Sequence, residues 1–199
     1  MTQIIKVTEP LLQIVERSNQ PTLIVQSAPV QIANHMGQLI PFSVDSFLAD
    51  AATNFPQFLV QTPSGTFRNS LRFSHTVSQK CRSPQFHMPA FTGVPSVRLT
   101  FAIPLTSGNV AFRVAVEAIK TTDNINTNTT RSFDTANNSG AIAVPANTYN
   151  TKDIIIPWTN RDGVTANDMV TFTIDRDISV ASNATDFCYL YAVSLEDES

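Results

Sequence analysis

From about residue 55 onward, apolar and polar residues alternate along the chain, which is the pattern of β-strands that bury one face. The clearest run has Val97, Leu99, Phe101 and Ile103 in alternation with polar or small residues. Comparable runs, separated by turns rich in Gly, Pro, Asn and Asp, occupy residues 71–77, 110–116, 170–174 and 187–195. About eight such strands predict an all-β protein with two packed antiparallel sheets. A jelly-roll β-sandwich is the first choice and an immunoglobulin-like sandwich is the second.

The last run places both of its tyrosines on the apolar parity of the strand. Tyr189 and Tyr191 share that parity with Phe187 and Val193, so packing in the core or at an interface is predicted for them. The sole tryptophan, Trp158, follows three isoleucines and a proline. Its place at a strand end is compatible with either a buried or an exposed ring.

Residues 1–44 lack the alternation and are interrupted by prolines. A short helix is predicted over residues 8–17, with Thr8 as its cap, and one helical turn over residues 43–50. The segment is too apolar for a free tail and too broken by proline for a domain of its own. We therefore divide the chain into an N-terminal, partner-anchoring arm over residues 1–44 and a jelly-roll domain over residues 45–199. The residues of the arm expected to contact the partner are Leu11, Leu12, Ile14, Val15, Leu23, Ile24 and Val25.

Composition and charge argue against several classes of partner. The chain has 199 residues, of which 42% are hydrophobic and only 15% are charged, and its formal net charge is −3. It has no cluster of Lys and Arg, so neither nucleic acid nor a charged membrane surface is an expected partner. No apolar run reaches the ~20 residues of a membrane span, and no signal peptide is visible. Cys81 and Cys188 match no metal or disulfide pattern and are expected to be free, buried thiols.

The sequence carries no motif of an active site or of a cofactor site. His35, His75 and His87 match no zinc-ligand spacing, and neither a phosphate-binding glycine loop nor a GxSxG turn is present. Four aspartates are candidates for calcium ligands: Asp162, Asp168, Asp175 and Asp177. A turn aspartate and charges on the solvent-facing side of a sheet are the simpler interpretation. We expect no catalytic residue, no cofactor, no metal and no small-molecule substrate.

Arg176 lies on the side of its strand that neighbouring residues make apolar, and Asp175 and Asp177 flank it. A guanidinium in that position predicts a structural ion pair or a hydrogen-bond anchor, either to backbone carbonyls or to a neighbouring subunit. Trp158 is a further candidate for a subunit interface or a structural anchor.

Four segments resemble a known group of proteins: residues 105–114, 142–146, 166–177 and 184–191. Their order and strand-end pattern resemble small jelly-roll virion proteins of tailed bacteriophages, of the capsid cement or decoration type. Asn167 stands where the pattern of that group prefers Gly, and Asp186 and Phe187 stand where it often has two acidic residues. The resemblance covers residues 55–196. It implies a homotrimer with a structural role.

Together these observations predict a non-enzymatic capsid cement protein. Residues 1–44 would hold neighbouring major capsid proteins, and the chain would be made in the host cytoplasm and end on the capsid surface of the virion. The alternative is a tail-fibre, spike or baseplate module that binds host-surface glycan through Trp158, Tyr149 and the loop over residues 121–150. A hydrolase that uses His75 or scattered carboxylates is the third possibility. Residues 1–44 show no fibre shaft, which favours the capsid.

Overall fold

The computed structural model of the chain has two compact units, residues 1–35 and 36–199. It describes residues 4–6, 13–17, 20–24, 37–50, 54–61, 67–120, 122–123 and 132–198. The first unit contains a three-stranded antiparallel sheet. In it β2 (Gln13–Arg17) lies between β1 (Ile4–Lys6) and β3 (Gln20–Ile24).

The helix predicted over residues 8–17 is wrong in its described part, because residues 13–17 form β2. Ile14 and Val15 are β-branched, which favours extended backbone over helix. The backbone of β2 also pairs on both sides, with Ile4 and Thr22 each opposite Val15. The remainder of the predicted helix lies outside the described residues.

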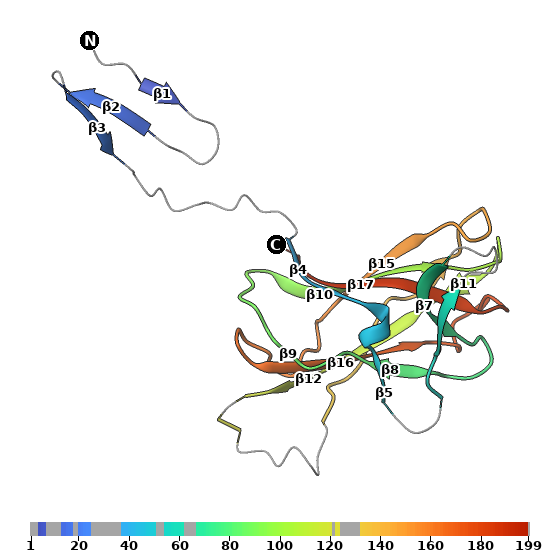
Figure 1. Ribbon diagram of the computed structural model, residues 1–199. Helices are drawn as coiled ribbons and strands as arrows, with labels where there is room; N and C mark the ends of the chain where they lie inside the picture. The colour runs from blue at the N-terminus through green and yellow to red at the C-terminus, as the bar shows by residue number, and fades with distance from the viewer. Residues whose placement is uncertain are drawn as a thin grey trace. The chain divides into compact units, whose positions relative to one another are not determined.

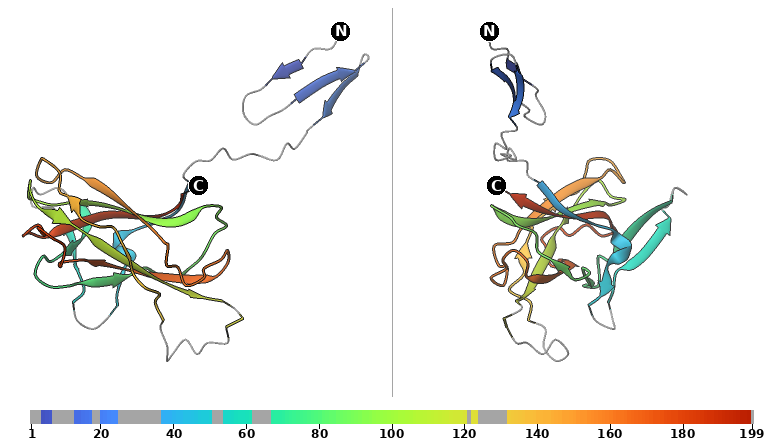
Figure 2. Two further views of the ribbon diagram at one scale, coloured as in Figure 1. Left: turned by 180° about the vertical axis from the view of Figure 1, so that it is seen from behind. Right: turned by 60° about the vertical axis from the view of Figure 1, so that its left-hand side comes forward.

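The second unit is a sandwich of two antiparallel sheets, which lie one above the other in Figure 1 and again in the turned views of Figure 2. The strands of the first sheet, in chain order, are β4 (Gly37–Phe42), β6 (Gln57–Gln61), β7 (Phe67–Phe73), β10 (Val94–Ala102), β15 (Lys152–Pro157) and β17 (Cys188–Glu198). Their spatial order is β15–β10–β17–β7–β6, and β4 pairs with the far half of β17. The C-terminus therefore lies beside the start of β4 (Figure 1).

The strands of the second sheet, in chain order, are β5 (Leu48–Ala49), β8 (Lys80–Arg82), β9 (Phe86–His87), β12 (Phe112–Ile119), β13 (Asn137–Asn138) and β16 (Met169–Arg176). Their spatial order is β13–β12–β16–β8–β5, and β9 also pairs with β16. Two shorter strands, β11 (Asn109–Val110) and β14 (Ile142–Ala143), pair with each other, and a 3-10 turn, η1 (Val44–Ser46), joins β4 to β5.

The chain passes back and forth between the two sheets in the manner of a jelly roll. From β7 in the first sheet it crosses to β8, returns for β10 and crosses again to β12 and β13. It then returns for β15, crosses to β16 and ends in β17, between β7 and β10. This is the arrangement of two interlocked Greek keys, and it confirms the predicted all-β jelly-roll sandwich.

The boundary predicted after residue 44 lies too far along the chain. β4 pairs with β17 through Phe42 opposite Val193, and both Phe42 and Val44 are buried in the core. Residues 37–44 therefore belong to the sandwich, because their backbone completes a ladder and their side chains fill the core. The helical turn predicted nearby corresponds to η1.

The core lies between the sheets, and its centre is the ring of Phe172 on β16. This ring makes edge or tilted contacts with four others: Phe42 at 5.3 Å, Phe47 at 6.1 Å, Phe86 at 6.2 Å and Trp158 at 5.6 Å between centroids. Because Phe42 and Trp158 come from the first sheet and its flank, the cluster joins the two layers. Such aromatic pairs add to the free energy gained from burial alone.

We expect Phe172→Ala to lower the free energy of unfolding by about 3–5 kcal/mol, since it removes a buried ring and leaves a cavity between the sheets. Urea denaturation followed by tryptophan fluorescence measures this directly through Trp158. Val77→Ala is the control: Val77 is 43% exposed, so its truncation should change the stability by less than about 0.5 kcal/mol. Equal effects of the two variants would contradict the position assigned to Phe172.

Candidate functional site

The outer face of the first sheet, opposite the core, carries the candidate site. On β7, Leu71 and Phe73 point into the core, so the residue between them, Arg72, points outward. Tyr189 on β17 is paired with Arg72, and paired residues of antiparallel strands share a face. Tyr189 therefore belongs to the outer face, on the same row as Arg72 and Gln57 of β6.

A β-bulge brings a second tyrosine to the same face. On β10, Thr100 pairs with Ala192 and Phe101 pairs with Leu190, so Tyr191 has no partner in that ladder. Leu190 and Val193 are both buried, and the two residues between them both turn outward. The prediction that Tyr189 and Tyr191 share the core parity of Val193 is therefore wrong, because the extra residue reverses the alternation halfway along the strand.

Tyr149 completes a cluster that contains all three tyrosines of the chain. Its ring centroid is 6.2 Å from that of Tyr189, and 42% of the residue is exposed. Its backbone is left-handed, with φ of 61°, although a bulky side chain disfavours that conformation. The Tyr149 amide donates to the Ile103 carbonyl at 2.8 Å, which holds the strained residue in place. Strained residues of this kind are concentrated at functional sites.

We call this region the tyrosine surface and define it by Tyr149, Tyr189, Tyr191, Arg68 and Arg72. Burial and the neighbouring Tyr149 raise the pKa of Tyr189. Burial and the neighbouring Tyr189 raise the pKa of Tyr191. Both phenols are therefore protonated at neutral pH, so that each can donate one hydrogen bond and accept others. The surface thus combines flat apolar rings with neutral hydroxyls and guanidinium groups.

A polar cluster follows on the same face of the sheet, centred on Arg98 of β10. Its Nε and Nη2 donate to the two carboxylate oxygens of Glu196 at 2.7 and 2.9 Å, and its Nη1 donates to Asp153 at 3.1 Å. Thr100 donates to the other oxygen of Asp153 at 2.7 Å. The hydrogen bond with Glu196 raises the pKa of Arg98 above its usual range. Arg98 is therefore permanently charged and fully paired.

Trp158 lies in the core and does not form an exposed platform. The residue is 0% exposed, and its amide donates to the Pro95 carbonyl at 2.8 Å. Ile154, Ile156 and Trp158 are all buried, so the alternation of β15 continues through Pro157 and turns the indole inward. The expectation that Trp158 binds glycan or contacts a second subunit is therefore wrong.

Arg176 anchors the loop that leads into β17. Its guanidinium is fully buried and donates to the carbonyls of Asp186 at 2.7 Å and Ala184 at 2.6 Å, and to the side-chain oxygen of Asn183 at 3.0 Å. Burial lowers the pKa of Arg176, with no ion pair within 4.0 Å among the described residues to offset it. Of the partners predicted for Arg176, backbone carbonyls of its own chain are the ones that it contacts.

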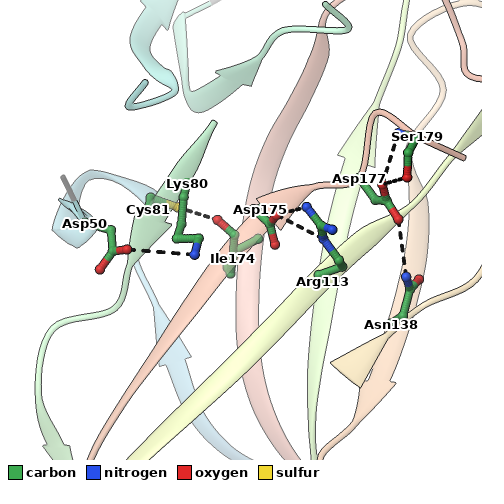
Figure 3. A network of polar contacts seen from close by, with 9 residues as sticks. All are labelled: Asp50, Lys80, Cys81, Arg113, Asn138, Ile174, Asp175, Asp177 and Ser179. Carbon is green, nitrogen blue, oxygen red and sulfur yellow. Dashed lines mark hydrogen bonds and ion pairs between the residues drawn. The ribbon is translucent and has the colours of Figure 1, made fainter. Parts of the chain in front are cut away.

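The two flanking aspartates stabilise the outer side of the second sheet, as Figure 3 shows. Arg113 of β12 donates to Asp175 through Nε at 3.0 Å. Asp177 accepts from the Ser179 hydroxyl at 2.6 Å and from the Ser179 amide at 3.0 Å, and Asn138 donates to it at 3.3 Å. The hydrogen bond from the Ser179 hydroxyl is the main reason that the pKa of Asp177 is lowered. Both carboxylates are thus engaged within the chain.

The residues predicted to contact a partner through the N-terminal arm are divided between two groups. Ile14 and Val15 lie in β2, and Leu23 and Ile24 lie in β3. The other three, Leu11, Leu12 and Val25, lie outside the described residues. Their contacts, and the predicted trimer, stay predictions.

In the described part of the chain, no three His, Cys, Asp or Glu residues are grouped so that they could hold a metal ion. The carboxylates of Asp162 and Asp168 accept hydrogen bonds from the amides of Ala118 and Thr165. Burial raises the pKa of the Cys188 thiol to about 12, which leaves it unreactive at neutral pH. Nowhere in the described segments is there a helix with the length and apolarity to cross a bilayer.

Sequence reasoning named Tyr149 as a glycan contact but did not place Tyr189 and Tyr191 beside it, because it could not detect the bulge. Around residues 187–193 both parities of the strand are apolar or aromatic, so the alternation did not select a face. The available signal was Arg72, a cation between two core residues, but its pairing with Tyr189 follows from the fold and not from the sequence.

No protein-family model and no curated protein matches the sequence. Among solved structures, the chain is similar to the C-terminal CBM6 of LamC, a laminarinase from Zobellia galactanivorans. The two share 11% identity with a TM-score of 0.43, over 79% of this chain and 98% of that one. A family 6 carbohydrate-binding module from Clostridium cellulolyticum, in complex with xylose, aligns with 10% identity and a TM-score of 0.43, over 78% of this chain and 95% of that one. The K3 cleaved adhesin domain of Lys-gingipain from Porphyromonas gingivalis aligns with 10% identity and a TM-score of 0.41, over 81% of this chain and 100% of that one.

The prediction of a bacteriophage capsid cement protein finds no support in these comparisons and is withdrawn. Two of the three are carbohydrate-binding modules and the third is an adhesin domain, and none of the three is a virion protein. The predicted capsid-binding arm is also shorter than expected, because residues 37–44 are part of the sandwich. At these identities and TM-scores the likeness assigns no residue of this chain to a function.

We expect Arg176→Met to lower the free energy of unfolding by about 3 kcal/mol or more, because the loop carbonyls lose their donors while remaining in place beside an apolar side chain. Urea denaturation checks this. Arg176→Lys restores the charge but not the planar fork and should recover only part of the loss. Arg68→Met, at an exposed position of β7, is the matched control and should be close to neutral. A stable Arg176→Met variant would contradict the anchoring role.

The lowered pKa of Asp177 predicts a loss of stability in acid. A carboxyl group whose pKa is lower in the folded than in the unfolded chain stabilises the fold above its unfolded pKa of about 3.9, and this contribution disappears as the pH falls through the folded pKa. The wild type should therefore exceed Asp177→Asn in free energy of unfolding at pH 7, and the difference should shrink below about pH 4. Ser179→Ala should reduce the same pH-dependent difference. A difference that is independent of pH would show that the charge of Asp177 has no part in it.

Proposed function

We propose that this chain is a glycan-binding module whose ligand lies on the tyrosine surface of the first sheet. The observation that carries the proposal is Tyr149. It is an exposed aromatic residue in a strained left-handed backbone conformation, and its ring packs against that of Tyr189, which is 7% exposed. A sandwich that needed only stability would gain by placing a glycine or an asparagine at such a position.

Sugars and tyrosines are complementary in their chemistry. A sugar ring presents an apolar face of C–H groups, which packs over the electron-rich face of an aromatic ring, and a rim of hydroxyls, which need hydrogen-bond partners. Tyrosine offers both features in a rigid side chain that loses little conformational entropy on binding. Tyr189 and Gln57 supply donors and acceptors in one row of the sheet, through Arg72 between them, and Tyr191 supplies another hydroxyl two residues further along β17.

The surface is also prepared for binding before any ligand arrives. Arg72 stacks over the ring of Phe187 at 4.2 Å and donates through Nη2 to Gln57, which holds the row of side chains in one arrangement. Strand pairing fixes the backbone beneath them. Such preorganisation lowers the entropic cost of binding and favours even a shallow site. The proposal keeps the glycan of the alternative stated from the sequence, but replaces Trp158 by Tyr189 and Tyr191.

We expect the purified chain to bind oligosaccharides on a glycan array. Tyr149→Ala should lower the affinity for the oligosaccharide that binds by at least about tenfold, because aromatic anchors contribute most of the energy of such contacts. Tyr149→Phe should retain most of the affinity. Leu48→Ala, at a residue of the second sheet that is 50% exposed, is the control and should bind as the wild type does. The proposal would be refuted if no glycan on the array bound, or if Tyr149→Ala bound as strongly as the wild type.

A second measurement separates binding from folding at the same position. Tyr149→Gly should be more stable than Tyr149→Ala by about 1 kcal/mol, because glycine adopts a positive φ without the steric cost that alanine has. Both variants should nevertheless lose the glycan to the same extent. If affinity followed stability across the two variants instead, Tyr149 would be a structural residue.

A further inference from the structure

The cations of the sandwich fall into two groups according to their partners. Lys80, Arg98 and Arg113 each have a carboxylate oxygen within 4.0 Å. The other described cations of the sandwich have none within that distance: Arg68, Arg72, Arg82, Lys120, Lys152, Arg161 and Arg176. Two of them, Arg68 and Arg72, lie on β7 beside the tyrosines. Arg98 is therefore directly paired with carboxylates, whereas Arg68 and Arg72 of the same sheet are not.

Arg72 is held in a fixed orientation without a counterion. Phe187 supports the flat side of its guanidinium at 4.2 Å, and Gln57 accepts from Nη2. Its Nε is buried and has no hydrogen-bond partner among the described residues, and the same is true of the Ser70 hydroxyl one position along the outer face. A stacked, oriented guanidinium with unused donors is the arrangement that suits a planar anionic group.

The acidic group that faces this end of the sheet is Asp186, which adds, after burial and Tyr149, to the rise in the pKa of Tyr189. Asp186 accepts a hydrogen bond from the amide of Phe187 at 2.6 Å through Oδ1. No oxygen of this carboxylate lies within 4.0 Å of the guanidinium nitrogens of Arg72, although Phe187 lies beneath that guanidinium. Arg68 is exposed, and its positive charge lies near enough to Tyr191 to oppose the rise in that tyrosine's pKa that burial and Tyr189 cause. The tyrosine surface thus has two guanidinium groups beside its rings that form no direct ion pair with a described carboxylate.

We infer that the glycan bound at this surface is acidic, with a sugar carboxylate or sulfate bound by Arg68 and Arg72 while Tyr149 stacks on the ring. The inference rests on the proposed function and names the class of its ligand. An anionic group here would supply the charged acceptor that neither guanidinium group has within 4.0 Å among the described residues. A neutral sugar would offer the two guanidinium groups no charged acceptor, and would lose the stronger, charge-assisted part of the contact.

The test uses two matched pairs of ligands that differ in charge. Oligogalacturonate and its methyl ester differ only in the sugar carboxylates, and dextran sulfate and dextran differ only in the sulfates. Titration calorimetry with the whole chain should detect binding of at least one of the two acidic ligands. The affinity for its neutral counterpart should be at least about tenfold lower, the difference expected for a hydrogen bond to a charged group. The affinity for the acidic ligand should fall as salt rises from about 0.05 M to about 0.5 M.

Variants then assign the charge to the two arginines. Arg68→Gln should weaken the acidic ligand about tenfold and leave the neutral partner unchanged, whereas Lys80→Gln makes the same change in net charge on the second sheet and should alter neither. Arg72→Lys keeps the charge but removes the fork, so it should weaken the acidic ligand without unfolding the protein. Thermal denaturation of each variant confirms that the fold is intact.

The failure of this inference differs from the failure of the proposed function. Equal affinity for the acidic and neutral members of a pair, still lost in Tyr149→Ala, would overturn the acidic ligand and leave glycan binding in place. The same conclusion follows if only neutral glycans bind on the array. No binding of any glycan would overturn both. If Lys80→Gln lowered the affinity for the acidic ligand as much as Arg68→Gln does, net charge, and not the tyrosine surface, would control that affinity.

Discussion

The pairing of β17 holds the first sheet together, and most of the molecule depends on its register. β17 pairs with β10 along one side and with β7 and then β4 along the other, so it is the one strand that links the earliest and latest parts of the sandwich. Its inner face contributes Leu190, Val193 and Leu195 to the core. The bulge at Tyr191 lets both halves of the strand keep an apolar inner face while the parity changes between them.

A buried arginine fixes where that strand begins. Arg176 on the second sheet binds the carbonyls of Ala184 and Asp186, which precede β17 directly. A guanidinium is suited to this role because its donors lie in one plane and reach several acceptors at once, so that a loop without regular structure can be buried with its polar groups satisfied. The position of Tyr189, three residues further on, therefore depends on a contact between the two sheets.

The first sheet carries cations of two kinds, those paired with carboxylates and those without a carboxylate partner. Around Arg98, two carboxylates neutralise the cation, and the cluster ties β10, β15 and β17 together. Around Tyr149, strain, exposure and unpaired cations occur together. Stability alone disfavours each of these three features, so their coincidence is better explained by a ligand that uses them.

The sequence by itself determined the fold class, because alternation such as that of Val97, Leu99 and Phe101 permits only a strand with one buried face. It also indicated the anchor at Arg176, since a cation on an apolar parity needs acceptors. It could not determine the position of β4, because Pro41 and the residues around it pair with a strand that lies about 150 positions later, and no local pattern records that partner. The tertiary structure alone decided which residues form the candidate site. The burial of Trp158 and the outward turn of Tyr191 follow from packing and from one extra residue in a ladder, and a single-residue shift of register moves every later side chain to the opposite face.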